Sequence, residues 1–590
     1  MLPASFPRPR GSSAHEPWGP SGGDEALSRM TGGPSRQNPR HGWAAMILLL
    51  ATGLACSFPS ARAARPGGIS AQALEKTLQA GGVPLTPAPS QAAAPPTLSM
   101  PTAQTSPPNQ NPATPFPGLQ TATPGSPAVV SLPPPLVSTP ACPGGQSRGT
   151  SPGATPPADQ PPFQYPAQAG DTLFSLAARF GVDAEEITSA RPVDPQRLIE
   201  PGQILVIPNR YLPAAYPSAV MPDSEVVDSP TAVDLDLPAF ISAAGGYLSA
   251  YSETVDKQTL SGSEIVRRVA LETSVNPRIL LAFLEFRSGW VSGRPDPGQV
   301  DHPLGFYVTG YNGLYKELSL AAKELNIGYY CWRSGTRTTL EFKDGGATPF
   351  SPALNAGSVA VQFLFAKIYP AESWAAALYG PQGFLALYTR LFGDPWQRAA
   401  AVEPLYPASL AQPPLDLPFA PGERWALTSG PHISWNTGTP PGALDFAPIT
   451  GERGCGTSRA WALASADGVV VRSENGELTL DLDGDGHEET GWVLLYLHLA
   501  ASERAAAGTV VRAGDRLGHP SCEGGSATGI HVHVARKYNG EWIPADGPAP
   551  FVLSGWTAHA GEKPYQGTLT RGGEVVTAQP DGSHGSTIVR

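Results

Sequence analysis

Two short stretches in the last third of the chain decide its fold class: VLLYLHL at residues 493–499 and GIHVHV at residues 529–534. Both are rich in β-branched, leucine and aromatic residues, and a strand places alternate side chains on one face. His531 and His533 therefore share a face of the second stretch. Six of the eleven histidines lie between His432 and His533. We expect an antiparallel all-β domain over about residues 415–560, followed by a C-terminal tail at 561–590.

The composition changes along the 590 residues. The chain holds 67 Pro and 65 Gly, and most of the excess Pro precedes residue 163. Such a segment buries too little apolar surface to offset its ordering entropy, so residues 57–163 are predicted to be a long disordered linker. The formal net charge of -11 argues against a nucleic-acid partner, because no basic stripe is present to neutralise phosphates.

Residues 1–56 are interpreted as an N-terminal extension with an export signal. The apolar run at 43–56 follows Arg36 and Arg40 and is too short for a comfortable membrane span. Its end, GLAC, resembles a bacterial lipoprotein signal with Cys56 as the lipidated residue, although Leu usually stands where Gly53 is. An ordinary cleaved signal and an uncleaved anchor remain alternatives. The expected location is the cell envelope, either anchored by lipid or secreted to the wall.

Residues 164–208 form a compact segment. Gly170, Asp171 and Thr172 predict a turn and a helix cap, and apolar residues follow at helical spacing before a closing strand. The segment resembles a LysM module through its GDTL start, FGV middle and GQILVIP end. The resemblance implies a small βααβ fold that binds peptidoglycan glycan, with Gly170, Asp171 and Thr172 as candidate contacts. An unrelated βααβ unit is the alternative.

The middle of the chain is predicted to be a linker at 209–235 and a mostly α-helical domain at 236–400, because apolar residues recur at i, i+3 and i+4. Its stretch at 276–290 weakly resembles the helix of lysozyme-like transglycosylases that carries the catalytic acid. Arg287 occupies the position of that acid, and Glu285 lies about 200° away around the helix. A glycosidase needs a carboxyl group, so no catalysis is assigned to this domain, whose role stays unknown, and an active transglycosylase is the alternative.

Three further segments accompany the two strands, at 443–446, 464–470 and 508–518. In this order the blocks resemble LytM/lysostaphin-type zinc endopeptidases, whose signature runs from His and Asp through A-x-x-G-x-V and Y-x-H-L to a Gly-bearing turn and H-x-H. The resemblance covers about 430–548. It implies a zinc metalloendopeptidase that hydrolyses peptide bonds of peptidoglycan.

One position departs from the main pattern, because Pro441 stands where most members place their first zinc histidine. In the β-lytic branch this histidine lies thirteen residues before the aspartate, ahead of an Asn-Thr-Gly turn, and His432 stands thirteen residues before Asp445. The resemblance thus implies that His432, Asp445 and His533 hold one Zn²⁺ and leave a position open for water. A loop role for His432 and a dead site form the alternative.

The same resemblance gives His498 and His531 catalytic roles, as general base and as electrostatic partner, without deciding which does which. A rival interpretation is a LytM-type regulator that lacks metal and activates a separate wall amidase. A third is a secreted protease that acts on ordinary Gly-rich proteins.

Two features border this site. Cys455 and Cys522 are candidates for a disulfide if the chain is exported, with unpaired thiols as the alternative. The motif DLDGDG at 481–486 begins like a calcium loop, but Trp492 stands where the bidentate Glu would be, so an acidic hairpin turn is favoured over Ca²⁺. Its carboxylates are Asp481, Asp483 and Asp485.

Overall fold

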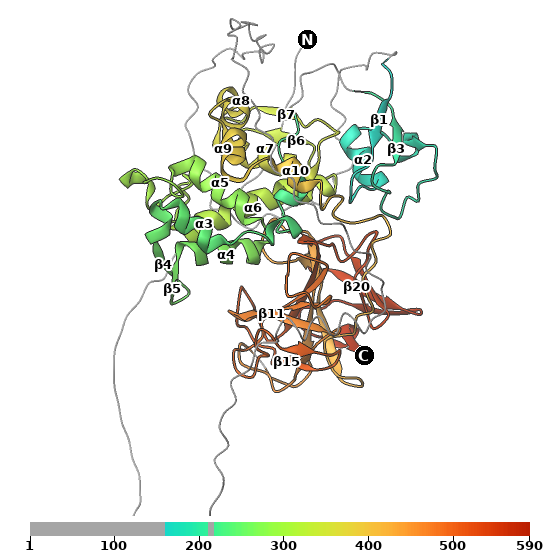
Figure 1. The fold of residues 1–590 in the computed structure, drawn as a ribbon. Coiled ribbons are helices and arrows are strands. Elements are labelled where there is room, and N and C mark those ends of the chain that lie inside the picture. Colours follow the sequence, from blue (N-terminus) through green and yellow to red (C-terminus); the bar gives the residue numbers. More distant parts are fainter. Residues whose placement is uncertain (1–159, 211–217, 453) are drawn as a thin grey trace, which may run out of the picture. The chain divides into compact units, whose positions relative to one another are not determined.

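The computed structural model describes residues 160–210, 218–452 and 454–590. The predicted export signal, the lipidation at Cys56 and nearly all of the predicted linker at 57–163 lie outside these residues. Within the described part of the chain, no helix combines the length and the apolar character that crossing a membrane requires. Figure 1 shows the elements in chain order, from the small sheet of residues 163–207 through the helices to the C-terminal strands.

The first folded region is a three-stranded antiparallel sheet, ordered β1-β3-β2, with one helix. Thr172 begins the helix with a capping box, in which its side chain accepts from the Ser175 amide. The predicted second helix is only one 3₁₀ turn, and an added short strand pairs with β3. The elements are β1 (Phe163–Pro166), α2 (Leu173–Phe180), η1 (Ala184–Glu186), β2 (Thr188–Ser189) and β3 (Ile204–Ile207).

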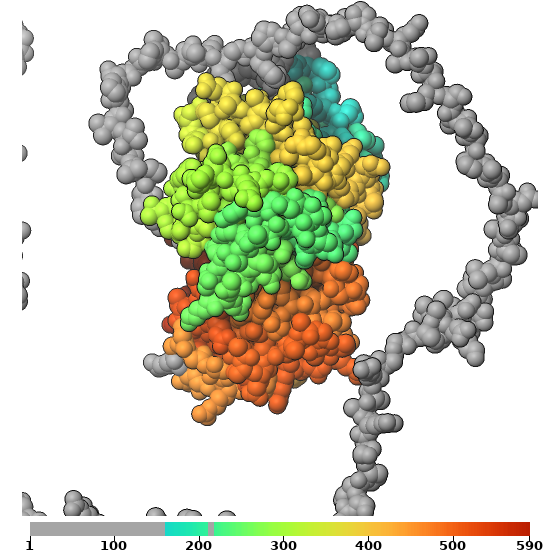
Figure 2. All heavy atoms as spheres, turned by 60° about the vertical axis from the view of Figure 1, so that its left-hand side comes forward, coloured from blue at the N-terminus to red at the C-terminus, as the bar shows by residue number. Residues whose placement is uncertain are grey.

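The middle region is helical, as its periodicity predicts, with two small hairpins. The longest helix, α6, lies against α7, and Gly328 permits this approach because an added Cβ would be 2.8 Å from the Ala360 Cα. The helices are α3 (Leu237–Ala244), α4 (Gly262–Thr273), α5 (Pro277–Ser288), α6 (Leu314–Arg333), α7 (Ala356–Ile368), α8 (Ala371–Tyr379), α9 (Phe384–Phe392) and α10 (Pro395–Ala399). The hairpin strands are β4 (Ser252–Val255), β5 (Gln258–Ser261), β6 (Thr339–Glu341) and β7 (Ala347–Pro349). The atoms of this region pack into the continuous green and yellow surface of Figure 2.

The segment predicted as a linker at 209–235 is instead largely part of this helical region. Val220 and Met221 are buried in its core, and the 3₁₀ turns η2 (Asp223–Glu225) and η3 (Pro230–Ala232) follow them. Three of its four acidic residues are buried, and among them Glu225 is fully buried and pairs with Arg398 at 2.8 Å. The composition suggested a linker because Arg398, which pairs with Glu225, lies more than 100 residues away in the sequence.

The C-terminal region is built on a nine-stranded antiparallel sheet ordered β14-β11-β12-β13-β16-β9-β8-β22, with β17 paired to β16. A four-stranded sheet, β18-β19-β20-β21, shares its apolar core. The main-sheet strands are β8 (Arg424–Ile433), β9 (Pro441–Pro448), β11 (Gly468–Glu474), β12 (Glu477–Asp481), β13 (Trp492–Leu497), β14 (Val510–Val511), β16 (Val532–Tyr538), β17 (Glu541–Trp542) and β22 (Thr587–Val589). The others are β10 (Ala462–Leu463), β15 (Arg516–Gly518), β18 (Val552–Leu553), β19 (Trp556–Ala560), β20 (Gly567–Arg571) and β21 (Glu574–Thr577).

Residues 561–590 are not the tail that the sequence patterns suggest. They form β20, β21 and β22, and β22 closes one edge of the main sheet by pairing with β8. Leu569 and Ile588 are buried in the shared core. The strands are short and separated by Gly-rich turns, which makes them weak signals in sequence.

Four buried charged side chains form a connected group of ion pairs at the main sheet. Glu488 bonds to Arg472 at 2.8 Å and to Lys537 at 2.9 Å, and Arg472 also pairs with Glu477. Burial alone would raise the pKa of Glu488, but the two cations outweigh it and lower the pKa to about 2. Burial raises the pKa of Glu477 to about 7, because Arg472 offsets only part of the desolvation and Glu488 repels its charge.

The helical region and the main sheet share one core cluster. The sheet contributes Ala443, Leu495, Ala535 and Trp542 to it, and Ile543 follows directly after β17. The Trp542 amide donates to the hydroxyl of Tyr330 on α6 at 2.9 Å. These contacts make the two regions one packed structure rather than domains joined only by a connecting segment.

Candidate active site

The three predicted metal ligands come from three neighbouring strands. His432 lies near the end of β8, Asp445 in β9 and His533 in β16. Asp445 is the register partner of His533 across β9 and β16. The register of β8 against β9 shifts on both sides of His432, between Ser429 and Ile433. This irregular pairing accommodates the thirteen-residue separation and brings His432 to the other two side chains.

The ligand atoms of these residues converge in a buried cluster. The Asp445 Oδ1 lies 3.3 Å from the His432 Nε2 and 3.2 Å from the His533 Nδ1. The two ring nitrogens are 3.1 Å apart. All three side chains are buried, and the three atoms lie within the spacing that one metal ion needs.

In each of the two imidazole rings, the nitrogen that points away from the cluster determines the tautomer. The His432 Nδ1 faces the Gly430 carbonyl at 2.9 Å, and the His533 Nε2 faces the Ser434 carbonyl at 2.8 Å. A carbonyl only accepts, so both outer nitrogens donate, and neutral rings then direct their lone pairs inward. The buried Asp445 Oδ1 also has no hydrogen-bond partner. Three lone-pair donors facing one another are unfavourable unless a cation lies between them, so these residues fit a metal.

His498 and His531 flank this cluster. His498 follows the last residue of β13 and has a left-handed backbone with φ 68°, so it departs from the strand alternation that its sequence predicts. His531 directly precedes β16. Their ring centroids are 4.5 Å apart, and the His531 Nε2 is 3.7 Å from the Asp445 Oδ2.

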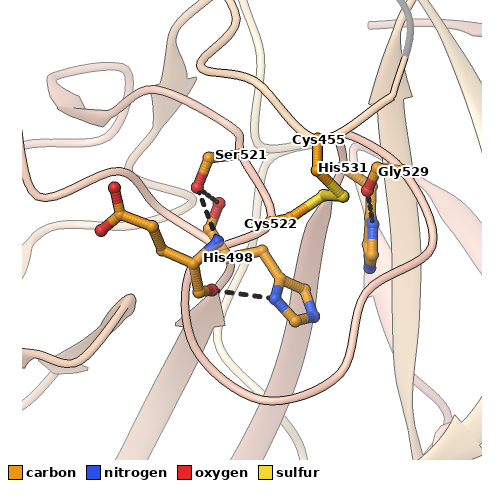
Figure 3. Close-up of a disulfide and its surroundings, with 7 residues drawn as sticks. Cys455, His498, Ser521, Cys522, Gly529 and His531 are labelled. Atoms are coloured by element: carbon orange, nitrogen blue, oxygen red, sulfur yellow. Dashed lines mark hydrogen bonds between the residues drawn. A yellow bond between two sulfur atoms is a disulfide. The ribbon is translucent and has the colours of Figure 1, made fainter. Parts of the chain in front are cut away.

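Each of these two imidazoles donates Nδ1–H to a backbone carbonyl, His498 to Glu523 at 3.0 Å and His531 to Gly529 at 2.8 Å (Figure 3). The Nε2 of each neutral ring is therefore a proton acceptor. Burial, reinforced by His531 and His533, lowers the pKa of His498 to about 4, so His498 is neutral at neutral pH. His498 thus has the neutral state that a general base requires, and the His531 Nε2 is free of the bond that its Nδ1 makes to Gly529.

A tyrosine that the sequence patterns did not single out also belongs to the site. The Tyr565 ring stacks on His432 with centroids 4.7 Å apart and an interplanar angle of 25°. Its carbonyl accepts from the Gly430 amide at 2.8 Å. Burial, reinforced by the charge of Asp445, raises the pKa of Tyr565. It lies in the turn between β19 and β20, and no local motif marks it, because only the fold brings it to His432.

An open groove of about 540 Å³ runs beside Asp445 and His531. The formal charges on its lining residues are all negative, from Asp445, Glu452 and Asp581. Its other polar side chains are neutral hydroxyls, contributed by Thr428, Ser429, Thr450 and Thr528. An extended chain without excess negative charge suits such a groove.

The three candidate glycan contacts of the first folded region have structural roles. The Asp171 carboxylate is fully buried and bonds to Arg179 and to the Tyr165 hydroxyl, each at 2.8 Å. Thr172 caps α2. An added Cβ at Gly170 would lie 2.5 Å from the Tyr406 hydroxyl. The GDT signature here therefore maintains the fold, and the exposed aromatic ring beside it is Phe174, whose exposed fraction is 70%.

The two bordering features are also visible. Cys455 and Cys522 form a disulfide with Cα atoms 5.3 Å apart. The carboxylates of Asp481, Asp483 and Asp485 lie close together in the β12–β13 turn. Asp481 accepts from the amides of Asp483 and Gly486, so the turn satisfies its buried carboxylate by itself. This favours the acidic hairpin turn.

Comparison with family models assigns two parts of the chain. Residues 165–208 match the LysM domain, and residues 219–407 match the LasA N-terminal domain. The second match covers the helical region, for which the sequence patterns suggested only a weak lysozyme-like resemblance. Its start at residue 219 agrees with the buried segment that begins at Val220.

Two similar curated proteins are both protease LasA, from Pseudomonas aeruginosa UCBPP-PA14 and PAO1. The chain is 27% identical to them over 302 and 300 residues, which is 46% of this chain and 65% of each relative. Similar solved structures include the M23 metalloprotease pseudoalterin (24% identity, 31% of this chain and 100% of that one, TM-score 0.25) and the lysostaphin catalytic domain from Staphylococcus simulans (21% identity, 21% and 89%, TM-score 0.16). By these matches the chain carries a LysM domain and a region similar to the LasA N-terminal domain, and it spans about two thirds of the length of the protease LasA sequences to which it is similar.

Proposed function

We propose that this protein is an exported zinc metalloendopeptidase that cleaves peptide bonds of peptidoglycan and is held on wall glycan by its LysM domain. The observation that carries the proposal is the set of inward lone pairs of His432 and His533 around the buried Asp445 Oδ1, which has no hydrogen-bond partner. Two imidazoles and one carboxylate are a typical ligand set for a catalytic zinc with one open position.

A zinc ion bound there would lower the pKa of a water molecule far below its bulk value, to about 7. The Nε2 atoms of His498 and His531 are the acceptors available for the proton of that water. After attack on the peptide carbonyl, the protonated ring would donate its proton to the amine that leaves. Tyr565, whose ring stacks on His432, is our candidate for the hydroxyl that donates a hydrogen bond to the developing oxyanion.

The groove supports a wall peptide as the substrate. Its negative charges favour neutral Gly-containing bridges or segments with free amino groups over acidic ones. The LysM match supplies a reason for such peptides to be near, because wall glycan carries them. The rival proposal, a regulator without catalysis, is less well supported because both the ligand set and the two proton acceptors are present.

A wall-digestion assay tests this function. Purified peptidoglycan is incubated with the parent, with His533→Ala and with His487→Ala, each with and without a chelator. His487 is a matched control because its side chain is 48% exposed in the β12–β13 turn. We expect release of wall peptides only from the parent and the control, and only without chelator. Equal release by His533→Ala would refute the hydrolase.

A parallel arm adds a wall amidase and measures its activation, which would identify a regulator. A dansylated Gly-rich peptide without glycan tests general proteolysis. Cleavage of that peptide at the rate seen with wall fragments would contradict a peptidoglycan-specific role.

A further inference from the structure

His498 lies where the sheet no longer fixes it. Strand β13 ends at Leu497, and the left-handed backbone of His498 turns away from the ladder. The adjacent segment 521–523 holds the residue instead. The His498 carbonyl accepts from the Ser521 amide at 2.7 Å and from its hydroxyl at 3.0 Å, and the ring donates to the Glu523 carbonyl. The direction of the His498 Nε2 therefore depends on where these residues lie.

The segment that holds His498 has little regular structure of its own. Residues 522–530 contain no helix or strand and include Gly524, Gly525 and Gly529. Glycine allows many backbone conformations, so such a segment is not rigid without fixed contacts. The Cys522 side chain provides a covalent one, through its disulfide to Cys455. Figure 3 shows this bond close to both imidazoles, with Ser521 and Cys522 beside His498.

Backbone contacts also connect the chain segments next to the two cysteines. The Ser458 amide, three residues beyond Cys455, donates to the Pro520 carbonyl at 2.9 Å. Ser521 also forms an antiparallel bridge with His531, so it lies between the two candidate bases. The metal ligands differ in this respect, because the register of β8, β9 and β16 sets their positions.

We propose that the Cys455–Cys522 disulfide and Ser521 are positioning groups for His498, so that the site becomes fully active only after this disulfide forms. The inference rests on the proposed function. With the bond closed, segment 521–523 holds the imidazole with its Nε2 toward the metal ligands. With two thiols, the metal still binds but the ring samples other directions. Closure occurs by exchange with a disulfide-bearing oxidant, which accepts two electrons and two protons and leaves as two thiols. The protein therefore becomes fully active only after it reaches an oxidising compartment.

The test uses substitutions in the full chain, because a reductant could also withdraw the metal. The variants are Cys455→Ser with Cys522→Ser, Ser521→Ala, Ser521→Thr and the control Ser554→Ala. Ser554 donates to Asp416 and accepts from the Leu417 amide in the β18–β19 turn, so its loss weakens the same domain without touching segment 521–523. Bound zinc, kcat and KM for wall fragments are measured at a temperature where all variants remain folded by circular dichroism.

We expect the double cysteine variant to keep about one zinc per chain and a KM within about 2-fold, while kcat falls by about 10-fold or more, since a general base contributes about 10²–10⁴-fold. Ser521→Ala lowers kcat less, and Ser521→Thr restores part of it because the hydroxyl is retained. The control keeps the kcat of the parent. An unchanged kcat in the double variant overturns the proposal, and so does a fall in kcat that matches a loss of zinc. A parent that releases no peptide overturns the proposed function itself.

Discussion

Zinc should stabilise the folded chain strongly, and His533→Ala should remove most of that effect. For a ligand that binds only the folded state, free zinc at 100 times its Kd raises the free energy of unfolding by about 2.7 kcal/mol. Changes to groups that merely orient a ligand weaken metal binding about 10–100-fold, so loss of a direct ligand should cost at least about 100-fold. At the same zinc concentration His533→Ala would then gain only about 0.4 kcal/mol.

Urea unfolding followed by the fluorescence of the 12 tryptophans measures both values, in chelator and in a zinc buffer. Without zinc, the lone pairs of His432 and His533 face and repel each other, and His533→Ala removes one of them. In the absence of zinc this variant should therefore lose less free energy of unfolding than an ordinary truncation of a buried side chain. His487→Ala should show the full gain of the parent. Equal zinc stabilisation of the parent and His533→Ala would refute the ligand assignment.

Four further outcomes are expected. Replacing Cys455 and Cys522 by Ser should lower the free energy of unfolding by about 4 kcal/mol, because the bond closes a loop of 67 residues, and urea titration measures this. Tyr565→Phe should retain zinc and KM but lower kcat about 100-fold if the hydroxyl stabilises the oxyanion; an unchanged kcat would exclude that role. Because the pKa of Glu477 is raised to about 7, the stability of the parent relative to Glu477→Gln should fall as pH rises from 4.5 to 7. For Glu488, whose pKa is lowered to about 2, the advantage of the parent over Glu488→Gln should instead fall as pH drops below 4.5; equal slopes would contradict both assignments.

Local periodicity predicted one part of the C-terminal site, because strand alternation places His531 and His533 on one face. The assignment of His432 as a ligand came instead from the resemblance to the β-lytic branch. In the structure its separation from Asp445 corresponds to one irregular hairpin. The structure brings His432, Asp445 and His533 within one cluster.

Other parts of the fold depend on distant partners and could not be predicted. The position of Tyr565 follows from the pairing of short C-terminal strands, which leave no periodic signal. Glu225 resembles a solvated linker residue until Arg398 is placed beside it. Asp171 belongs to a recognised motif, yet the motif did not distinguish a buried structural carboxylate from a contact residue.

The core cluster common to the helices and the main sheet limits how the molecule can be divided for experiments. A fragment trimmed to begin near residue 415 would lose the side chains that cover Trp542, Ile543 and Ala443. Those residues would then face water as an apolar patch, which promotes self-association. Low solubility of such a fragment would thus report a missing neighbour rather than a defective peptidase fold, and fragments that begin near residue 218 should behave better.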